Sequence, residues 1–151
     1  MIVADEPVAS LDVSVQAQIL QVFQELQHRL GLTAVFISHD ISVVSHVSQR
    51  IAVMYLGNIV ELGPAQSVIQ YPVHPYSRAL MSAVLRLGRA PDQAPLRLSG
   101  DPPSPTALPA GCDFAARCYL EQVPDCQQLQ PQLREVSPGH FVACHKASSS
   151  V

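Results

Sequence analysis

The chain has 151 residues, 48% of them hydrophobic, and a formal net charge of −3 at pH 7. Nine lysines and arginines against twelve acidic residues provide no basic surface of the kind that binds DNA or RNA. No apolar run reaches the roughly 18 residues that a membrane-spanning helix needs, and the first residues lack the pattern of a signal peptide. We therefore expect one domain, or a half-domain with an appendage, that associates with a membrane only through a partner.

Two short apolar runs near the N-terminus are predicted to be neighbouring strands. Residues 2–4 lead into Asp5 and Glu6, and residues 33–38 lead into His39. Strands of an open α/β sheet present such groups at their C-terminal ends, where these sheets bind ligands. The sequence therefore predicts an α/β fold with a phosphate-handling site at this edge.

Between these strands, apolar residues recur with the period of one helix face. Asp12 or Ser14 is predicted to cap this helix, and Gly31 to end it. The apolar stripe is predicted to pack on the sheet. It consists of Val15, Ile19, Val22, Phe23, Leu26 and Leu30.

The next segment is predicted to contain a short helix and a β-hairpin. Apolar residues at helical spacing after His39 favour the helix, over residues 41–47. Residues 51–56 and 59–62 are rich in β-branched side chains. Gly57 and Asn58 between them are typical of a two-residue turn.

Two more helices are predicted from the preference of proline for the first helical position. One runs from Pro64 to about Gln70, and the other begins at Pro75. His74, just before the second helix, is expected to be a capping or surface group. The second helix carries an apolar side formed by Leu80, Val84 and Leu87.

The composition changes after residue 87. Six prolines within residues 88–110 forbid a continuous helix and favour a stiff linker. We therefore predict three parts: residues 1–87, the linker 88–110 and a small cysteine-rich extension, 111–151. All four cysteines lie in the extension, at Cys112, Cys118, Cys126 and Cys144.

Four thiolates around one centre can hold a zinc ion or an iron–sulfur cluster. Zinc ribbons usually bring cysteines in pairs two to four residues apart, and no pair here is that close. The spacing favours a larger cluster mildly and leaves zinc and free thiols as alternatives. His140 and His145, on either side of Cys144, are expected to be solvent-exposed rather than ligands.

The segment from Asp5 to Gln18, followed by Phe-Ile-Ser-His-Asp at 36–40, resembles the Walker B, D-loop and switch-histidine segments of ABC transporter ATPases. His-Pro-Tyr-Ser at 74–77 is similar to a motif of the peptide importers. Residues 111–144 resemble the C-terminal extension of dipeptide and oligopeptide importer ATPases. The resemblance implies the C-terminal part of an ABC ATPase nucleotide-binding domain plus that extension.

The resemblance also implies cofactors and roles. With ATP and Mg²⁺ as cofactors, Asp5 would hold magnesium through its water shell, Glu6 would polarise the attacking water and His39 would sense the γ-phosphate. Asp12 and Ser10 would face the other subunit of an ATPase dimer, although the family more often has serine before alanine where this chain has the reverse order. The four cysteines would hold the [4Fe–4S] cluster with which members of the family are associated.

Several ABC ATPase motifs are missing from these residues. No Gly-x-x-x-x-Gly-Lys-Ser/Thr loop is present, and the only lysine is Lys146. The family's glutamine loop and Ser-Gly-Gly signature are also absent. The chain is therefore expected to be the C-terminal part of a longer ATPase, starting inside the Walker B strand, and not to hydrolyse ATP by itself.

Two functions remain as hypotheses. The first is the energising ATPase subunit of an ABC importer, peripheral at the cytoplasmic face of the inner or plasma membrane. Its partners would be a second ATPase subunit and transmembrane permease subunits, without direct contact to the peptide. The alternative is a non-catalytic, metal-binding module that docks on a transporter ATPase and regulates it. The transported substrate is left open between dipeptides, oligopeptides, nickel and other solutes.

Overall fold

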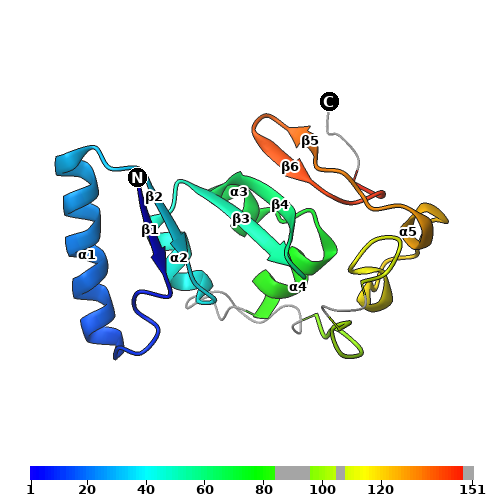
Figure 1. Cartoon of the computed structure of the whole chain (residues 1–151), viewed down its shortest axis with the longest axis horizontal. Helices are drawn as coiled ribbons and strands as arrows, with labels where there is room; N and C mark the ends of the chain where they lie inside the picture. Colours follow the sequence, from blue (N-terminus) through cyan, green and yellow to red (C-terminus); the bar gives the residue numbers. More distant parts are fainter. Residues whose placement is uncertain (84–95, 105–107, 148–151) are drawn as a thin grey trace. The chain divides into compact units, whose positions relative to one another are not determined.

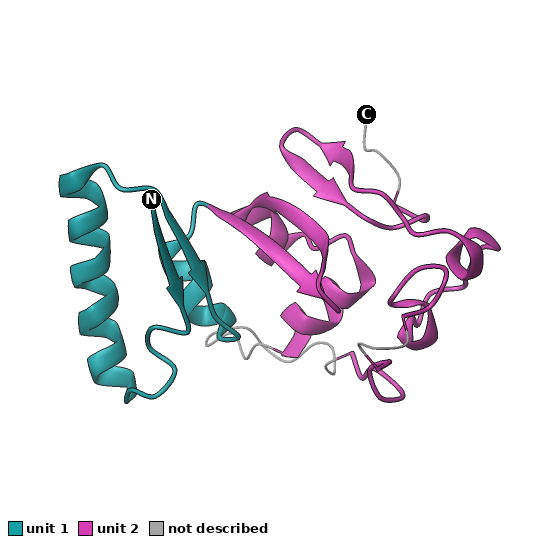
Figure 2. Cartoon of the chain, in the orientation of Figure 1, with its two compact units in different colours: residues 1–49 teal, residues 50–151 magenta. Residues whose placement is uncertain are grey.

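The computed structural model describes residues 1–83, 96–104 and 108–147. It confirms the α/β class and divides the chain into two compact units, residues 1–49 and 50–151 (Figure 2). This division differs from the predicted one, which set the cysteines apart from residues 1–87 behind a linker. None of the helices in the described ranges has the length and apolar character needed to cross a membrane.

Unit 1 contains two parallel strands and two helices (Figure 1). β1 (Ile2–Asp5) pairs with β2 (Ala34–Ile37). α1 (Val13–Leu30) supplies the crossover that parallel strands require, and α2 (Ile41–Val47) follows β2. The strands and helices predicted for this part of the sequence are confirmed.

Both ends of α1 are capped as the sequence predicts. The Asp12 carboxylate accepts a hydrogen bond from the Val15 amide at 2.9 Å. Gly31 follows the last turn with φ of 59°, in the left-handed region that glycine enters at least cost. These two residues fix where the crossover helix begins and ends.

The core of unit 1 is small. A buried cluster with Phe36 packed against it is formed by Val8, Leu20, Val43 and Val47. From the predicted stripe of α1, Phe23 reaches this core, with its ring centroid 5.7 Å from that of Phe36. The only fully buried residue of α1 is Leu20, which lies outside the predicted stripe.

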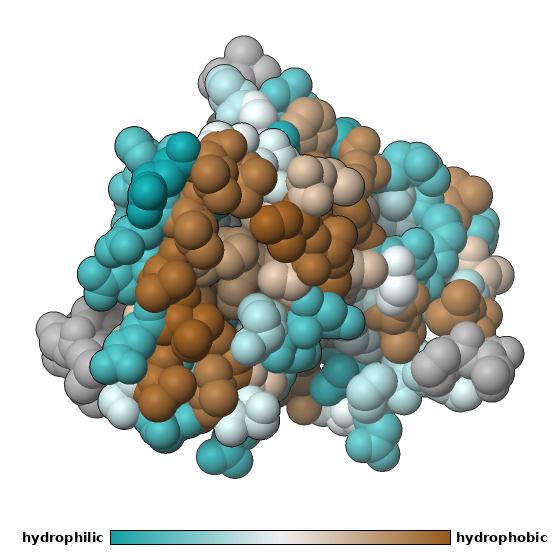
Figure 3. All heavy atoms as spheres, turned by 60° about the vertical axis from the view of Figure 1, so that its left-hand side comes forward, coloured by the Kyte–Doolittle hydropathy of each residue, from teal (hydrophilic) through white to brown (hydrophobic). Residues whose placement is uncertain are grey.

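Much apolar surface of unit 1 remains exposed, so the predicted packing of the stripe on the sheet is confirmed only in part, at Phe23. Two strands are too narrow to cover an 18-residue helix. On the sheet itself, Val35 and Ile37 are each 46% exposed. Figure 3 shows hydrophobic side chains gathered on the side of the surface where α1 lies. The exposed stripe residues, 44–64% accessible, are Ile19, Val22, Leu26 and Leu30.

Unit 2 is built on an antiparallel sheet with the strand order β3-β4-β6-β5. β3 (Arg50–Tyr55) and β4 (Asn58–Pro64) form the predicted hairpin. β5 (Arg134–Ser137) and β6 (His140–Val142) were not predicted, and β6 pairs with β4. The cysteine-bearing segment (residues 111–147) therefore completes the sheet that the hairpin begins.

The hairpin turn lies one residue earlier than predicted. Tyr55 pairs with Asn58, so the loop is Leu56-Gly57 rather than Gly57-Asn58. Both loop residues have positive φ, 46° and 84°, as a type I′ turn requires. This position could not be predicted from the sequence because leucine rarely adopts positive φ.

Two of the helices in unit 2 match the prediction. α3 (Ala65–Gln70) follows Pro64, which ends β4 instead of opening the helix. α4 (Pro75–Ala83) begins at the predicted proline. The predicted continuation through Val84 and Leu87 lies outside the described residues.

The cysteine-bearing segment has little regular structure beyond β5 and β6. It contains the 3₁₀ turn η1 (Ala115–Arg117) and the short helix α5 (Asp125–Gln128). Phe114 is only 1% exposed, and its ring centroid lies 5.2 Å from that of Tyr55 and 5.6 Å from that of Tyr76. This aromatic cluster joins the segment to β3 and α4. In the predicted linker, residues 96–104 and 108–110 form no helix or strand.

We predict that the exposed apolar surface of unit 1 makes the chain self-associate. Replacing Leu26 and Val35 together with glutamate should shift it toward the monomer, because an unpaired charge is costly to bury in a contact. Light scattering at several concentrations measures the change. Adding the same two charges at the exposed residues Gln18 and Thr33 is the matched control and should leave the association intact. A wild-type chain that is monomeric at every concentration would contradict the prediction.

Candidate functional site

The two predicted catalytic residues meet at the C-terminal edge of the β1–β2 sheet. Asp5 at the end of β1 lies opposite Ile37 at the end of β2. The Glu6 amide then donates a hydrogen bond to the Ile37 carbonyl at 2.9 Å. This parallel register carries Glu6 to His39, which follows it by 33 residues in the sequence.

One carboxylate oxygen of Glu6 contacts His39 twice. Oε1 accepts a hydrogen bond from the His39 amide at 3.1 Å and lies 2.8 Å from the imidazole Nδ1. The His39 side chain is 80% exposed and that of Glu6 38%. The hydrogen bond with Glu6, and then its negative charge, raise the pKa of His39 above its ordinary value.

Glu6 has two further features of a functional residue. Its φ of 47° lies in the left-handed region, which is uncommon for residues other than glycine and costs energy. Its second oxygen, Oε2, is buried and has no hydrogen-bond partner among the described residues. Buried polar atoms are normally paired, so this oxygen is available to a bound group.

The loop between Glu6 and Asp12 is held by Gln16, a residue that the sequence analysis did not identify. Its side-chain amide donates to the carbonyls of Val8 and Leu11, each at 3.1 Å. Both amide hydrogens of Gln16 are thus used to fix the loop. The available signal was its place in the first turn of the predicted helix, inside the Asp5–Gln18 segment that resembles the family.

The other predicted nucleotide-site residues make no side-chain hydrogen bond to the Glu6–His39 pair. Asp12 accepts hydrogen bonds from the Ser14 hydroxyl at 2.5 Å and the Val15 amide, and these lower its pKa. Asp5 and Ser10 are exposed, and within the described ranges their side chains make no hydrogen bond. Of the five predicted residues, Glu6 and His39 are therefore the two that a side-chain contact joins.

The four cysteines line one hollow in unit 2: Cys112, Cys118, Cys126 and Cys144. All four are half-buried and free of disulfides. Burial raises the pKa of the Cys112 and Cys118 thiols, and the other cysteines add to the rise at both. Across the residues that the structure describes, however, no three histidine, cysteine or acidic side chains are arranged to hold a single metal ion.

Backbone contacts bring distant cysteines to this hollow. The Cys112 amide donates to the Cys126 carbonyl at 2.9 Å. Gly111 passes so close that a Cβ there would collide with the same carbonyl oxygen. The Arg134 guanidinium donates to the carbonyls of Cys144 and His145, at 2.6 and 2.9 Å.

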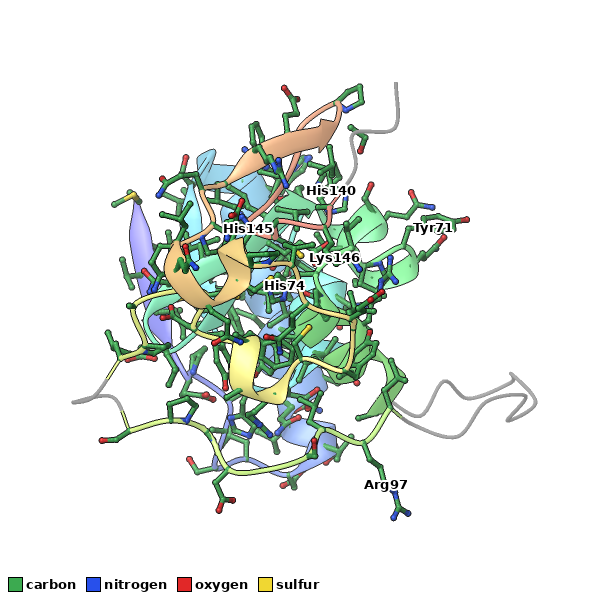
Figure 4. The ribbon with its side chains drawn as sticks, turned by 90° about the vertical axis from the view of Figure 1, so that its right-hand side faces the viewer. Tyr71, His74, Arg97, His140, His145 and Lys146 are labelled. Carbon is green, nitrogen blue, oxygen red and sulfur yellow. The ribbon has the colours of Figure 1, made fainter. Side chains whose placement is uncertain are left out.

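His74 also lines the hollow, together with His145 and Lys146 (Figure 4). Its Nδ1 accepts a hydrogen bond from the Tyr76 amide at 3.1 Å, which confirms the predicted cap of α4. The surface alternative is wrong, because His74 is 1% exposed. Burial lowers the pKa of His74 to about 4, so its ring is neutral at physiological pH.

The prediction that His140 is exposed is wrong. Its side chain is buried, and its Nε2 lies 2.7 Å from Oε1 of Glu61 on β4. His145 is half-buried, with its Nε2 2.9 Å from the Leu129 carbonyl oxygen. Both rings have partners inside unit 2 that lie far from them in the sequence.

Comparison with known proteins confirms the resemblance drawn from the sequence. Residues 60–126 match the family described as the C-terminal region of oligopeptide/dipeptide transporters. The chain is 49% identical to the dipeptide transport ATP-binding protein DppF of Escherichia coli, over 95% of its own length. It is 46% identical to the oligopeptide transport ATP-binding protein AppF of Bacillus subtilis, over 96%. It spans 42% and 44% of these curated relatives, less than half of each.

We predict that Glu6 controls the protonation of His39. Replacing Glu6 with glutamine should lower the pKa of His39 toward its ordinary value of 6.5, because the negative charge is lost. An NMR titration of the histidine rings measures this shift. Since the pKa is raised in the folded chain, the protonated pair is complete below about pH 6.5 and is lost as the pH rises through the raised value.

The matched control for this titration is Glu25→Gln, which removes an exposed carboxylate from α1. It should leave the titration of His39 unchanged. Identical His39 titrations in the wild-type chain and in Glu6→Gln would contradict the prediction.

Proposed function

Because this chain is related over 95% of its length to ATP-binding proteins of peptide and dipeptide transporters, we propose that it is part of the ATPase that energises an ABC peptide importer. The observation that carries this proposal is the contact of Glu6 Oε1 with the backbone amide and the ring Nδ1 of His39. The alternative, a non-catalytic module that binds metal and docks on a transporter ATPase, gains no support from the relatives.

Glu6 and His39 are the proposed catalytic pair. His39 occupies Oε1 of Glu6, so the buried Oε2 is left to polarise the attacking water. Nδ1 of His39 contacts Glu6, so Nε2 is the ring atom that would contact the γ-phosphate. The raised pKa of His39 favours the imidazolium form, which donates through both ring nitrogens.

The remaining predicted residues would contact groups outside this chain. Asp5 would hold Mg²⁺ through its water shell, and Asp12 and Ser10 would face a second ATPase subunit. All three are exposed, as such contacts require. ATP bound with Mg²⁺ supplies the phosphoanhydride bond whose hydrolysis drives transport.

The proposed setting is peripheral, at the cytoplasmic face of the inner or plasma membrane. Transmembrane permease subunits would form the path for the substrate, and the ATPase would not contact the transported peptide. The names of the relatives include both dipeptide and oligopeptide transport, so peptides are the proposed substrate class.

We also propose that the four cysteines hold a [4Fe–4S] cluster, with zinc as the alternative. The raised pKa values of the Cys112 and Cys118 thiols mean that a bound cation is needed to stabilise these two ligands as thiolates. A cluster of several irons holds its cysteines farther apart than one zinc ion does. The convergence of four cysteines around one hollow is the observation that supports this proposal.

The catalytic proposal is tested in a chimera that joins this chain to the part of the E. coli relative that it does not span. Glu6→Gln should leave ATP binding intact and reduce hydrolysis by roughly 10²-fold, as expected for loss of a general base. His39→Ala should also slow hydrolysis, whereas Glu25→Gln should not. Wild-type turnover in both Glu6→Gln and His39→Ala would overturn the assignment.

The cluster proposal is tested on the chain purified without oxygen. Metal analysis should find about four irons per chain, with broad absorption near about 400 nm. Cys126→Ser should lose most of the iron, because one ligand is removed. One zinc per chain would support the tetrahedral alternative, and four titratable thiols without metal would contradict both.

A further inference from the structure

A fully buried carboxylate joins three segments of unit 2. Glu61 on β4 has no exposed surface. Its Oε1 accepts a hydrogen bond from the Val73 amide, and its Oε2 accepts one from the His74 amide, each at 2.9 Å. Oε1 also lies 2.7 Å from Nε2 of His140 on β6. Burying a carboxylate is costly without such partners, so all three contacts are needed together.

Two of these contacts lead directly to the cysteine hollow. His74, whose amide is held by Glu61, forms part of the hollow's wall. His140 begins β6, and the chain then continues through Val142, which pairs with Glu61 in the sheet, to Cys144 in the wall. Glu61 therefore contacts the two segments that bring His74 and Cys144 to the hollow: the turn at residues 73–74, and β6.

The space for this contact is provided by a glycine. The ring of His140 packs on Gly63, where a Cβ would lie 2.8 Å from the ring's Cδ2. Any larger residue would push the ring from its place beside Glu61. The close approach of β4 and β6 thus depends on Gly63 and His140, which belong neither to the four cysteines nor to the ATPase motifs.

We infer that Glu61 is a positioning residue for the cysteine hollow, acting through His74 and His140. Its carboxylate fixes the turn before α4 and the start of β6, so that His74 and Cys144 face the same space. The inference rests on the proposed role of the cysteines as ligands to one centre. The hollow would be preformed by this buried carboxylate before any metal binds.

The test uses the whole chain, reduced and free of metal. Alkylation of each cysteine by iodoacetamide, followed by mass spectrometry, measures how well the hollow is closed. Glu61→Gln places an amide donor against a backbone donor, and His140→Leu removes the ring donor. Both should speed alkylation of Cys144 by about tenfold or more, the equivalent of losing one hydrogen bond to a charged group.

Two variants separate positioning from general stability. His140→Gln retains a side-chain donor of similar reach and should keep alkylation within about twofold of wild type. Glu25→Gln makes the same chemical change as Glu61→Gln at an exposed site in unit 1. It should have no effect. Amide exchange in the β3–β4 hairpin should remain slow in His140→Leu, because the loss is local.

Equal alkylation rates in the wild-type chain, Glu61→Gln and His140→Leu would overturn the inference. If Glu61→Gln fails to fold, equal rates in His140→Leu and His140→Gln would overturn it. Metal content is a separate readout: a wild-type chain without iron or zinc counts against the proposed cluster, while the alkylation rates still decide the role of Glu61.

Discussion

The joining of the cysteine-bearing segment to the β3–β4 hairpin depends on the buried carboxylate of Glu61. A charge with no exposed surface is tolerated only where its oxygens are paired, so the segments that supply the donors must assemble together. These are the turn at Val73 and His74, 12 and 13 residues away, and His140, 79 residues away. This requirement explains why the cysteine-bearing segment completes the sheet of the hairpin instead of forming a separate module.

Among the residues that the structure describes, two glutamate–histidine pairs have similar distances, and their surroundings give them different properties. Glu6 and His39 are 2.8 Å apart with the histidine 80% exposed, whereas Glu61 and His140 are 2.7 Å apart and almost fully buried. An exposed pair contributes little to stability and exchanges partners easily. A buried pair is strongly destabilising to break. The first pair therefore suits the proposed contact of His39 with a γ-phosphate, and the second suits a contact that holds two segments of the chain together permanently.

The sequence predicted features whose causes are local. The cap at Asp12, the end of α1 at Gly31 and the start of α4 at Pro75 each depend on residues within a turn, and all three are confirmed. His140 was mispredicted because its partner is remote and a lone histidine gives no sign of burial. Gln16 was missed for a related reason, since its acceptors are backbone carbonyls that no sequence motif displays.

The cysteine hollow depends both on features that the sequence displays and on contacts between residues that are remote in the sequence. The number and spacing of the cysteines were evident from the sequence, but their convergence depends on two remote features. Gly111 lets the chain pass against the Cys126 carbonyl, and β6 ends two residues before Cys144. Neither feature forms part of a cysteine motif. The half-buried Cys112 and Cys118 thiols, with their raised pKa values, are weak nucleophiles. The proposed role of the hollow as a metal site therefore rests on how the fold places the four side chains rather than on the reactivity of these two thiols.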